Sequence, residues 1–427
     1  MRKIVFFALW TVFCTSLSAQ NVREQLKEDL FKASSNYYAY PVPHRQPTPA
    51  PMGKKPFYLS HYARHGSRFM IKAKDYDYPY HVLRKAHELG KLSALGQQAL
   101  ERIESLREEA ENRYGELTPL GVVQHRQIAQ RMYDRFPQVF SDKAVIDAKS
   151  TTVIRCIMSM QSELLQLVKN NPRLNIKADA SQHDMYYMNL QDSALFKKRY
   201  PKESMDNYNK FCKPYAVDKQ AMSRLFNDSI YVRDSIDTYN LNLALFKMAS
   251  SVQGTEMRFH FNLFDIYTLD ELFNNWLQAN AYWYISFGNN PLNGGQQPFT
   301  QRNLLRKIIE EADSCIALPR PGSTLRFGHE TIVLPLTCLL GINGFDQQFT
   351  NLEDLDKHGW INFEVFPMAA NIQFVFYRKN PKDKDVLVKV LLNEDEATLP
   401  LETDCAPYYH WSDFRDYYLK KLDSFKE

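Results

Sequence analysis

Short apolar and aromatic runs recur along the chain, and the longer segments between them repeat their apolar residues at the spacing of a helix. Residues 57–62 form one such run, which is typical of a buried strand. Similar runs follow at residues 144–146, 324–328, 372–377 and 386–392. The last two flank a turn-rich segment and predict a hairpin. We therefore expect an α/β fold, in which a mixed open sheet carries helices on both faces.

Helical periodicity fills much of the sequence between these runs. Residues 80–113 show it, with breaks near their glycines. A second helix begins at Thr118, whose hydroxyl can cap it, and ends before Pro137. Within this helix His125 stands between polar neighbours, which favours a surface or packing residue over a catalytic one.

A further helix is predicted after the run at 144–146, with its apolar stripe on residues 154–168. Its first turn contains Arg155, although the helix macrodipole disfavours a cation there. An arginine that breaks this rule at a strand-to-helix turn is a candidate ligand for a bound anion. A solvated arginine is the alternative.

The middle of the chain differs from the rest, because it is rich in aromatic residues and strand signals are scarce in it. Its apolar residues form helical stripes, as in Leu269, Leu272, Phe273, Trp276 and Leu277 and in Leu304, Leu305, Ile308, Ile309 and Ala312. We expect a mainly helical inserted domain at residues 175–318. It would separate a first α/β part at residues 20–174 from a second at residues 319–427.

Three further expectations concern the C-terminal part. Residues 334–340 indicate a buried helix that has Pro335 in its first turn and ends at Gly341. The acidic stretch at residues 393–396 is expected to be a solvated turn. Residues 408–418 are rich in tyrosine and predict an amphipathic closing helix.

The N-terminus carries the pattern of a secretory signal peptide. Arg2 and Lys3 precede an apolar stretch that is too short to cross a bilayer, and small and polar residues follow as far as Ala19. We expect residues 1–19 to be removed near Ala19. The mature protein would then be periplasmic or secreted.

The composition excludes several classes of function. A hydrophobic content of 44% permits a large core, and a net charge of only +4 favours neither a nucleic acid nor a membrane surface as the partner. Of the 6 cysteines, all but Cys14 follow the signal peptide, so an oxidising compartment permits one or two disulfides and leaves at least one thiol unpaired. No spacing of cysteine and histidine is typical of a metal site, and we expect no metal and no cofactor.

A cluster of reactive side chains follows the first predicted strand, where residues 64–68 are Arg-His-Gly-Ser-Arg. The guanidinium groups of Arg64 and Arg68 match phosphate oxygens bidentately and keep their charge at all working pH values. Between them His65 supplies a nitrogen nucleophile. This grouping is typical of a site that holds a phosphoryl group beside an imidazole.

A second reactive pair follows the strand-like run at residues 324–328, where His329 precedes Glu330. Two strands that each end in a reactive histidine, here His65 and His329, indicate side chains that meet at the carboxyl edge of one sheet. Ligands bind at that edge in open α/β folds.

Together these motifs resemble those of the histidine acid phosphatases, in the branch that contains phytases and multiple inositol polyphosphate phosphatases. Residues 64–68 match the RHGxR signature of that family, and residues 117–124 are similar to its LTxxG helix start. Arg155 stands where the family has its third phosphate-binding arginine. Residues 326–331 resemble the distal motif, and residues 366–371 resemble a segment seen in inositol polyphosphate members.

The resemblance implies a phosphoglycerate-mutase-like sheet and a two-step hydrolysis without metal or cofactor. His65 would attack phosphorus and form a phosphohistidine, which water would then hydrolyse, and Glu330 would protonate the leaving oxygen. The phosphate-binding residues would be Arg64, Arg68, Arg155 and His329. Here Glu330 follows His329 directly, whereas phytases carry His-Asp and inositol polyphosphate phosphatases His-Ala-Glu, so the substrate preference stays open.

Inositol polyphosphates such as phytate are the expected substrates, and a broad-specificity acid or sugar phosphatase is the main alternative. A phosphoglycerate-mutase-like transferase would share the nucleophile. A secreted module that only binds phosphate esters would need no acid beside His329. Candidates for lining a pocket for a multiply charged ligand, each alternatively a solvated side chain, are Lys72, Lys74, Lys197, Lys198 and Arg199. We expect a monomer with a small-molecule phosphate ester as its partner, no nucleic acid and no membrane span.

Overall fold

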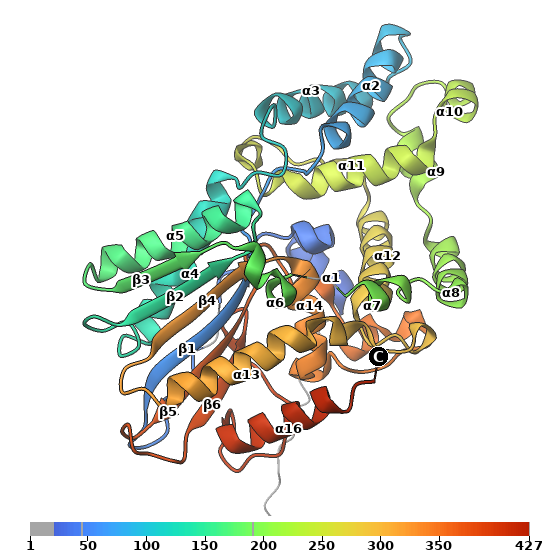
Figure 1. The fold of residues 1–427 in the computed structure, drawn as a ribbon. Coiled ribbons are helices and arrows are strands. Elements are labelled where there is room, and N and C mark those ends of the chain that lie inside the picture. The colour runs from blue at the N-terminus through green and yellow to red at the C-terminus, as the bar shows by residue number, and fades with distance from the viewer. Residues whose placement is uncertain (1–20, 44–45, 190–191, 427) are drawn as a thin grey trace, which may run out of the picture.

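The computed structural model describes residues 21–43, 46–189 and 192–426, so the predicted signal peptide lies outside the described residues. Its strands are β1 (Lys55–Arg64), β2 (Val145–Ser150), β3 (Asn175–Asp179), β4 (Gly322–Gly328), β5 (Asn371–Arg378), β6 (Leu387–Leu392), β7 (Asp395–Glu396) and β8 (Tyr408–His410). They form one 8-stranded sheet in the order β3-β2-β4-β1-β5-β6-β7, and β8 pairs with β6 (Figure 1).

The sheet is mixed, as the sequence predicts. β1 lies parallel to β4, and β2 lies parallel to both β3 and β4. β5 and β6 form the predicted hairpin and join β1 in the antiparallel direction. Strands β4, β5 and β6 are buried along their whole length. This burial on both faces explains why their sequences are apolar runs rather than alternating patterns.

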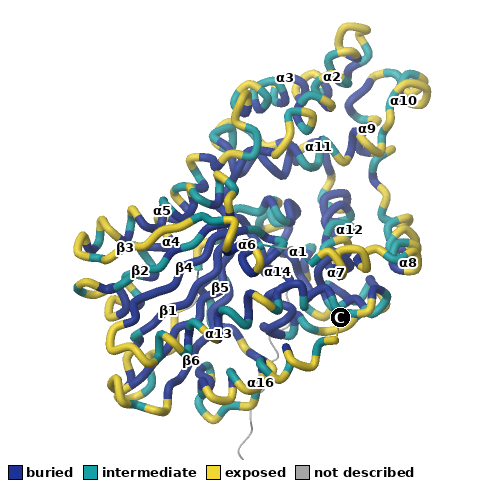
Figure 2. The backbone as a smooth tube through the Cα atoms, in the orientation of Figure 1, coloured by how far each residue is buried: buried dark blue, intermediate teal, exposed yellow. Residues whose placement is uncertain are grey.

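Helices cover both faces of the sheet. On one face lie α4 (Pro119–Arg135) and α5 (Ile154–Asn170), whose Ile128 and Leu164 pack in one core with Ile146 and Val375 of the strands. Over the other face lie α13 (Arg302–Ile316), α14 (Glu330–Leu340) and α16 (Trp411–Asp423) (Figure 1). Figure 2 shows the central strands of the sheet buried between them, whereas β3 at the edge is mostly exposed. The predicted fold class is confirmed.

The helical part of the molecule is less contiguous than predicted. Its elements include α7 (Ser193–Lys197), α8 (Lys202–Cys212), α9 (Asp218–Ser223), α10 (Ser229–Ser235), α11 (Thr238–Val252) and α12 (Leu269–Phe287). Two earlier helices, α2 (Ala73–Glu88) and α3 (Ala94–Glu109), join them, because α2 packs against α11 (Figure 1). Residues 175–179, predicted to open the insert, instead form β3, because they pair with β2.

Three predictions for the C-terminal part need correction. The buried helix starts at Glu330 rather than near residue 334, so Pro335 lies in its second turn. The acidic stretch at residues 393–396 is not a solvated turn, because Glu394 is only 3% exposed and its carboxylate lies 2.7 Å from the Arg131 guanidinium of α4. The closing helix is present as α16, but it starts at Trp411, because residues 408–410 pair with β6 as strand β8.

In the part of the chain that the structure describes, no helix is both long and apolar enough to cross a lipid bilayer. No disulfide forms among the described residues. The free thiols there are Cys156, Cys212, Cys315, Cys338 and Cys405.

Candidate active site

The carboxyl ends of three parallel strands meet at one edge of the sheet. Arg64 at the end of β1 pairs with Gly328 at the end of β4, and Ser150 at the end of β2 pairs with Phe327. The segments that follow these strands therefore begin side by side. This arrangement confirms that the two histidine motifs share one sheet edge.

The loop after β1 is held by backbone bonds from both neighbouring strands. The His65 N–H donates to the Gly328 carbonyl of β4 at 2.9 Å. On the other side the His65 carbonyl accepts from the Ala369 N–H at 3.0 Å, and the Arg64 N–H donates to the Ala370 carbonyl at 2.7 Å. The backbone that carries the imidazole is thus fixed before any ligand binds, as a reactive group requires.

The start of α4 closes over the same loop. The Ser67 N–H donates to Oε1 of Gln124 at 2.8 Å, and Oγ1 of Thr118 donates to the Ser67 carbonyl at 3.0 Å. A Cβ on Gly121 would lie 2.4 Å from that carbonyl oxygen, and a Cβ on Gly66 would lie 2.6 Å from the Gly121 carbonyl oxygen. The motif at residues 117–124 therefore positions the loop, and its glycines allow the two backbones to touch.

We expect Gly121→Ala to lower both stability and turnover. Alanine ordinarily stabilises a helix relative to glycine, but this Cβ would displace the Ser67 carbonyl and destabilise the fold by about 1–3 kcal/mol. Thermal unfolding and kcat measure the two effects. Val123→Ala, at an exposed position of the same helix, is the control that should leave both nearly unchanged. A Gly121→Ala protein as active and as stable as the wild type would contradict this role.

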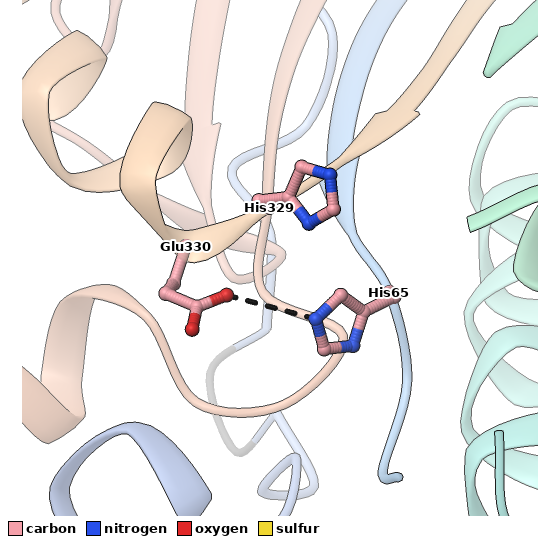
Figure 3. Close-up of side chains that lie close together, drawn as sticks. All are labelled: His65, His329 and Glu330. Carbon is pink, nitrogen blue, oxygen red and sulfur yellow. Dashed lines mark ion pairs between the residues drawn. The ribbon is translucent and has the colours of Figure 1, made fainter. Parts of the chain in front are cut away.

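His65 is fully buried and has one defined ring orientation. Its Nδ1 lies 2.9 Å from its neighbour's carbonyl oxygen, that of Gly66, so the proton belongs on Nδ1. The lone pair of Nε2 then faces the site, 3.6 Å from Oε2 of Glu330 (Figure 3). Burial, reinforced by the charges of Arg64 and Arg155, lowers the pKa of His65 well below its usual range. The imidazole therefore stays neutral and nucleophilic in weakly acidic solution.

Three arginines lie close enough to His65 and Glu330 for their charges to act on the pKa of one or both groups. Arg64 and Arg68 are 0% and 3% exposed, and Arg155 is half-buried at the start of α5. In the described part of the chain, Nη2 of Arg64, Nε of Arg68 and Nε of Arg155 are buried without a hydrogen-bond partner. Unpaired buried donors of this kind are costly unless a ligand satisfies them. The predicted anion-binding role of Arg155 fits its place beside the other two.

Repulsion between the cations contributes to the pKa of two of these arginines, Arg64 and Arg155. Burial and the neighbouring cations Arg68 and Arg155, opposed by Glu330, lower the pKa of Arg64 to about 10. Burial also lowers the pKa of Arg155, and the charge of Arg68 adds to that shift. An anion placed among these groups would relieve the repulsion, which favours the binding of a multiply charged phosphate.

His329 and Glu330 stand at the junction of β4 and α14. The His329 ring centroid lies 5.7 Å from that of His65, and its Nε2 lies 3.3 Å from Oγ1 of Thr151. Burial, aided by the charges of Arg155 and Arg64, lowers the pKa of His329 to about 4. His329 is therefore a neutral hydrogen-bonding group in the ligand-free site.

Glu330 lies against the cations. Its Oε2 is 3.2 Å from Nε of Arg64, and the residue occupies the first turn of α14, where the helix dipole favours an anion. Burial by itself would raise the pKa of Glu330, but the charges of Arg64 and Arg68 outweigh burial and hold it well below its usual range. The carboxyl group is therefore ionised in the ligand-free site.

Two further residues of the site come from the N-terminal segment that precedes β1. It forms α1 (Val22–Glu28) and a 3-10 helix, η1 (Leu30–Tyr37). Nδ2 of Asn36 donates to Oε1 of Glu330 at 3.3 Å. Nη1 of Arg68 donates to the Tyr37 hydroxyl at 3.3 Å, and its guanidinium lies 5.0 Å from the Tyr37 ring centroid. No motif marks these residues.

The other candidates have different surroundings. His125 is buried rather than on a polar face, with its Nδ1 2.7 Å from Oε1 of Glu163, so it is a packing residue. Lys72, Lys74, Lys197 and Lys198 are exposed, as the solvated alternative predicts. Arg199 is 6% exposed and stacks on Phe196, with 3.8 Å between the guanidinium and the ring centroid.

The ligand atoms of His65, His329 and Glu330 lie within 4.8 Å of one another, a spacing that a metal ion could bridge. Three guanidinium groups border the same space, however, and their positive charge opposes a cation. The site is therefore suited to an anion, with one nucleophilic nitrogen and one carboxyl group beside it.

Residues 62–393 match the sequence model of the histidine phosphatase superfamily, branch 2. A comparison with curated protein sequences gave no match. Among solved structures, the multiple inositol polyphosphate phosphatase of Bifidobacterium longum, in complex with inositol hexasulfate, is similar to this chain with a TM-score of 0.75 and 18% identity. That match covers 89% of this chain and 96% of the other.

Two phytase structures are also similar. The phytase from D. castellii matches with a TM-score of 0.69 and 13% identity over 92% of this chain and 86% of its own. The Hafnia alvei phytase in complex with tartrate matches with a TM-score of 0.53 and 13% identity over 87% of this chain and 98% of its own. Identities this low establish a shared fold, and the roles of the residues here must be argued from their own geometry.

Proposed function

Because this chain belongs to branch 2 of the histidine phosphatase superfamily, we propose that it hydrolyses inositol polyphosphates such as phytate through a phosphohistidine on His65. The observation that carries the proposal is the grouping of three arginines around a neutral imidazole with a single carboxyl group beside it. The proposal includes export from the cytoplasm, which is supported by the signal-like pattern of residues 1–19.

Binding is the first step of the proposed reaction. The unpaired N–H groups of Arg64, Arg68 and Arg155 donate hydrogen bonds to the oxygens of the phosphoryl group, and His329 adds a further hydrogen bond. Charge in a phosphoryl-transfer transition state lies on the equatorial oxygens, so fixed cations around them lower the barrier directly. The buried guanidinium groups need no reorganisation to do this.

Transfer to the enzyme follows. Nε2 of His65 attacks phosphorus, the P–O bond to the inositol oxygen breaks, and the departing alkoxide takes a proton from Glu330. A water molecule then attacks the phosphohistidine, the P–N bond breaks, and the Glu330 carboxylate receives the proton of the water. Phosphate is released, and both residues return to their starting states.

These reaction steps require Glu330 to be protonated when substrate is bound, although it is ionised in the ligand-free site. A bound phosphate dianion beside Glu330 explains how the carboxylate becomes protonated. The dianion neutralises Arg64 and Arg68, whose charges hold the pKa of Glu330 down, and adds a repelling negative charge, so the pKa rises. Substrate binding at weakly acidic pH thus leads to protonation of Glu330, which can then donate this proton to the leaving group.

The choice of substrate class is supported by similar folds. The B. longum phosphatase is seen with inositol hexasulfate, an inositol ring that bears six anionic groups, and the other two matches are phytases. A strongly cationic site suits such a ligand better than a sugar bearing a single phosphate. The preference of this chain for phytate is part of the proposal.

A substrate panel tests it. We expect kcat/KM for phytate to exceed that for glucose phosphates and nucleotides by about 10-fold or more, since uniform binding of extra phosphates by cations raises kcat/KM. Released phosphate is assayed, and the inositol phosphate isomers are resolved. Equal values across the panel would favour a broad-specificity phosphatase. Binding without any released phosphate would favour a phosphate-ester binding module and refute the proposal.

A further inference from the structure

A second group of reactive side chains lies at the other end of the sheet. Along the strands His410 pairs with Leu387, Leu387 with Tyr377, and Tyr377 with Pro56 near the start of β1. The candidate active site follows Arg64, at the opposite end of β1. Whatever this group binds is therefore separate from the phosphate site.

The group combines three types of metal ligand. Nε2 of His410 lies 3.1 Å from Oδ1 of Asp404. The Cys405 Sγ completes a set of ligand atoms that all lie within 4.8 Å of one another. In a tetrahedral zinc site, bond lengths of about 2.0–2.3 Å place neighbouring ligand atoms roughly 3.3–3.6 Å apart. Small side-chain rotations suffice to reach that geometry.

The histidine is already oriented for such a role. Its Nδ1 lies 2.8 Å from Oδ1 of Asp385, and Oδ2 of Asp385 lies 2.9 Å from the Lys54 ammonium. A carboxylate on one ring nitrogen keeps the proton there and leaves the other nitrogen free to ligate, the arrangement common behind metal-binding histidines. Asp385 would thus act as the orienting carboxylate, with Lys54 holding it in place.

The loop that carries the other two ligands is held by its own hydrogen bonds. The Thr403 hydroxyl accepts from the Cys405 N–H at 3.3 Å and donates to the Tyr408 carbonyl at 2.7 Å. The Tyr408 N–H in turn donates to the Cys405 carbonyl at 2.9 Å. The Asp404 side chain is 82% exposed, which leaves room for a metal and a water molecule from the solvent side.

We propose that Asp404, Cys405 and His410 bind one Zn²⁺ ion, with water as the fourth ligand and Asp385 orienting the histidine. A set of nitrogen, sulfur and oxygen ligands suits zinc better than the oxygen-seeking ions magnesium and calcium. Binding displaces the proton of the Cys405 thiol and any proton on Nε2 of His410, and no electron is transferred. The ion would tie the loop to the start of α16, which follows His410 directly.

The test measures metal binding directly on the whole mature chain after treatment with a chelator. Titration with ZnCl₂ followed by calorimetry should give one site, and Co²⁺ in its place should show a thiolate-to-cobalt charge-transfer band. Cys405→Ser should remove that band, and Asp385→Asn should weaken binding by about 10-fold to 100-fold. Cys212→Ser, at a partly buried thiol in α8, is the matched control that should leave both signals intact.

Two outcomes would overturn the proposal: an unchanged cobalt band in Cys405→Ser, or the absence of saturable zinc binding to the wild type. If Cys405→Ser does not fold, Asp404→Asn at an exposed position replaces it, and this variant should also weaken zinc binding. Loss of zinc binding in His65→Ala would instead place the ion in the phosphate site. Because none of these readouts depends on hydrolysis, failure of the zinc site and failure of the proposed phosphatase activity are distinguishable.

Discussion

Replacing His65 with alanine should reduce kcat for every phosphate ester by about 10⁴-fold or more, because the variant lacks the imidazole that receives phosphorus in the proposed reaction. The effect should not depend on the leaving group, since phosphorus cannot be transferred to the enzyme at all. Initial rates with phytate and with p-nitrophenyl phosphate measure it. Alkaline quenching with a radiolabelled ester should leave an acid-labile label on the wild type and none on His65→Ala.

The matched control is His61→Ala. His61 is as buried as His65 but lies within β1, and its ring packs on Phe327 with 5.7 Å between the centroids, outside the site. It should lower the unfolding temperature as His65→Ala does, because both remove a buried ring, yet leave turnover within a few-fold of the wild type. Label that persists on the His65→Ala protein would show that another residue carries the phosphorus.

Glu330→Gln should separate substrates by their leaving groups. Glutamine keeps the shape of the side chain and can still accept the hydrogen bond from Asn36, but it has no proton to give. Hydrolysis of alkyl phosphates should fall by about 10²–10⁴-fold. Hydrolysis of p-nitrophenyl phosphate, whose leaving group needs no proton, should fall far less. Equal losses on both substrates would count against Glu330 as the acid.

The pH profile supplies an independent check on the same residue. With alkyl phosphates, wild-type kcat should fall as pH rises through the raised pKa that Glu330 has in the complex, because the acid must be protonated to act. In Glu330→Gln this fall of kcat with rising pH should be absent. Glu108→Gln removes one negative charge from an exposed position on α3 and should still show the fall of kcat with rising pH. This control would exclude a general effect of net charge.

The residues to which we assign the chemistry can be recognised in the sequence because each lies next to a strong local signal. His65 and His329 each follow a run that is apolar enough to be a buried strand, and parallel strands bring their carboxyl ends together. Arg155 stands out because a cation in a first helical turn conflicts with the helix dipole. Each of these signals is a local pattern that can be recognised from a few neighbouring residues.

The features that could not be predicted from the sequence depend on contacts between distant segments. Asn36 and Tyr37 reach the site from a segment without clear periodicity, and only the packed fold shows it. The burial of Glu394 requires the Arg131 side chain to lie opposite it, which the acidic stretch itself does not reveal. Likewise, no pattern within residues 73–109 indicates that they pack against a helix more than a hundred residues later.

The hydrogen bonds that hold the His65 backbone have a consequence for synthesis. Their partners, Gly328, Ala369 and Ala370, lie some three hundred positions further along the chain. A nascent polypeptide that ends before these residues has the nucleophile but lacks the backbone bonds to it from both sides of β1. The nucleophile is therefore held as the folded protein holds it only when almost the whole polypeptide has been made.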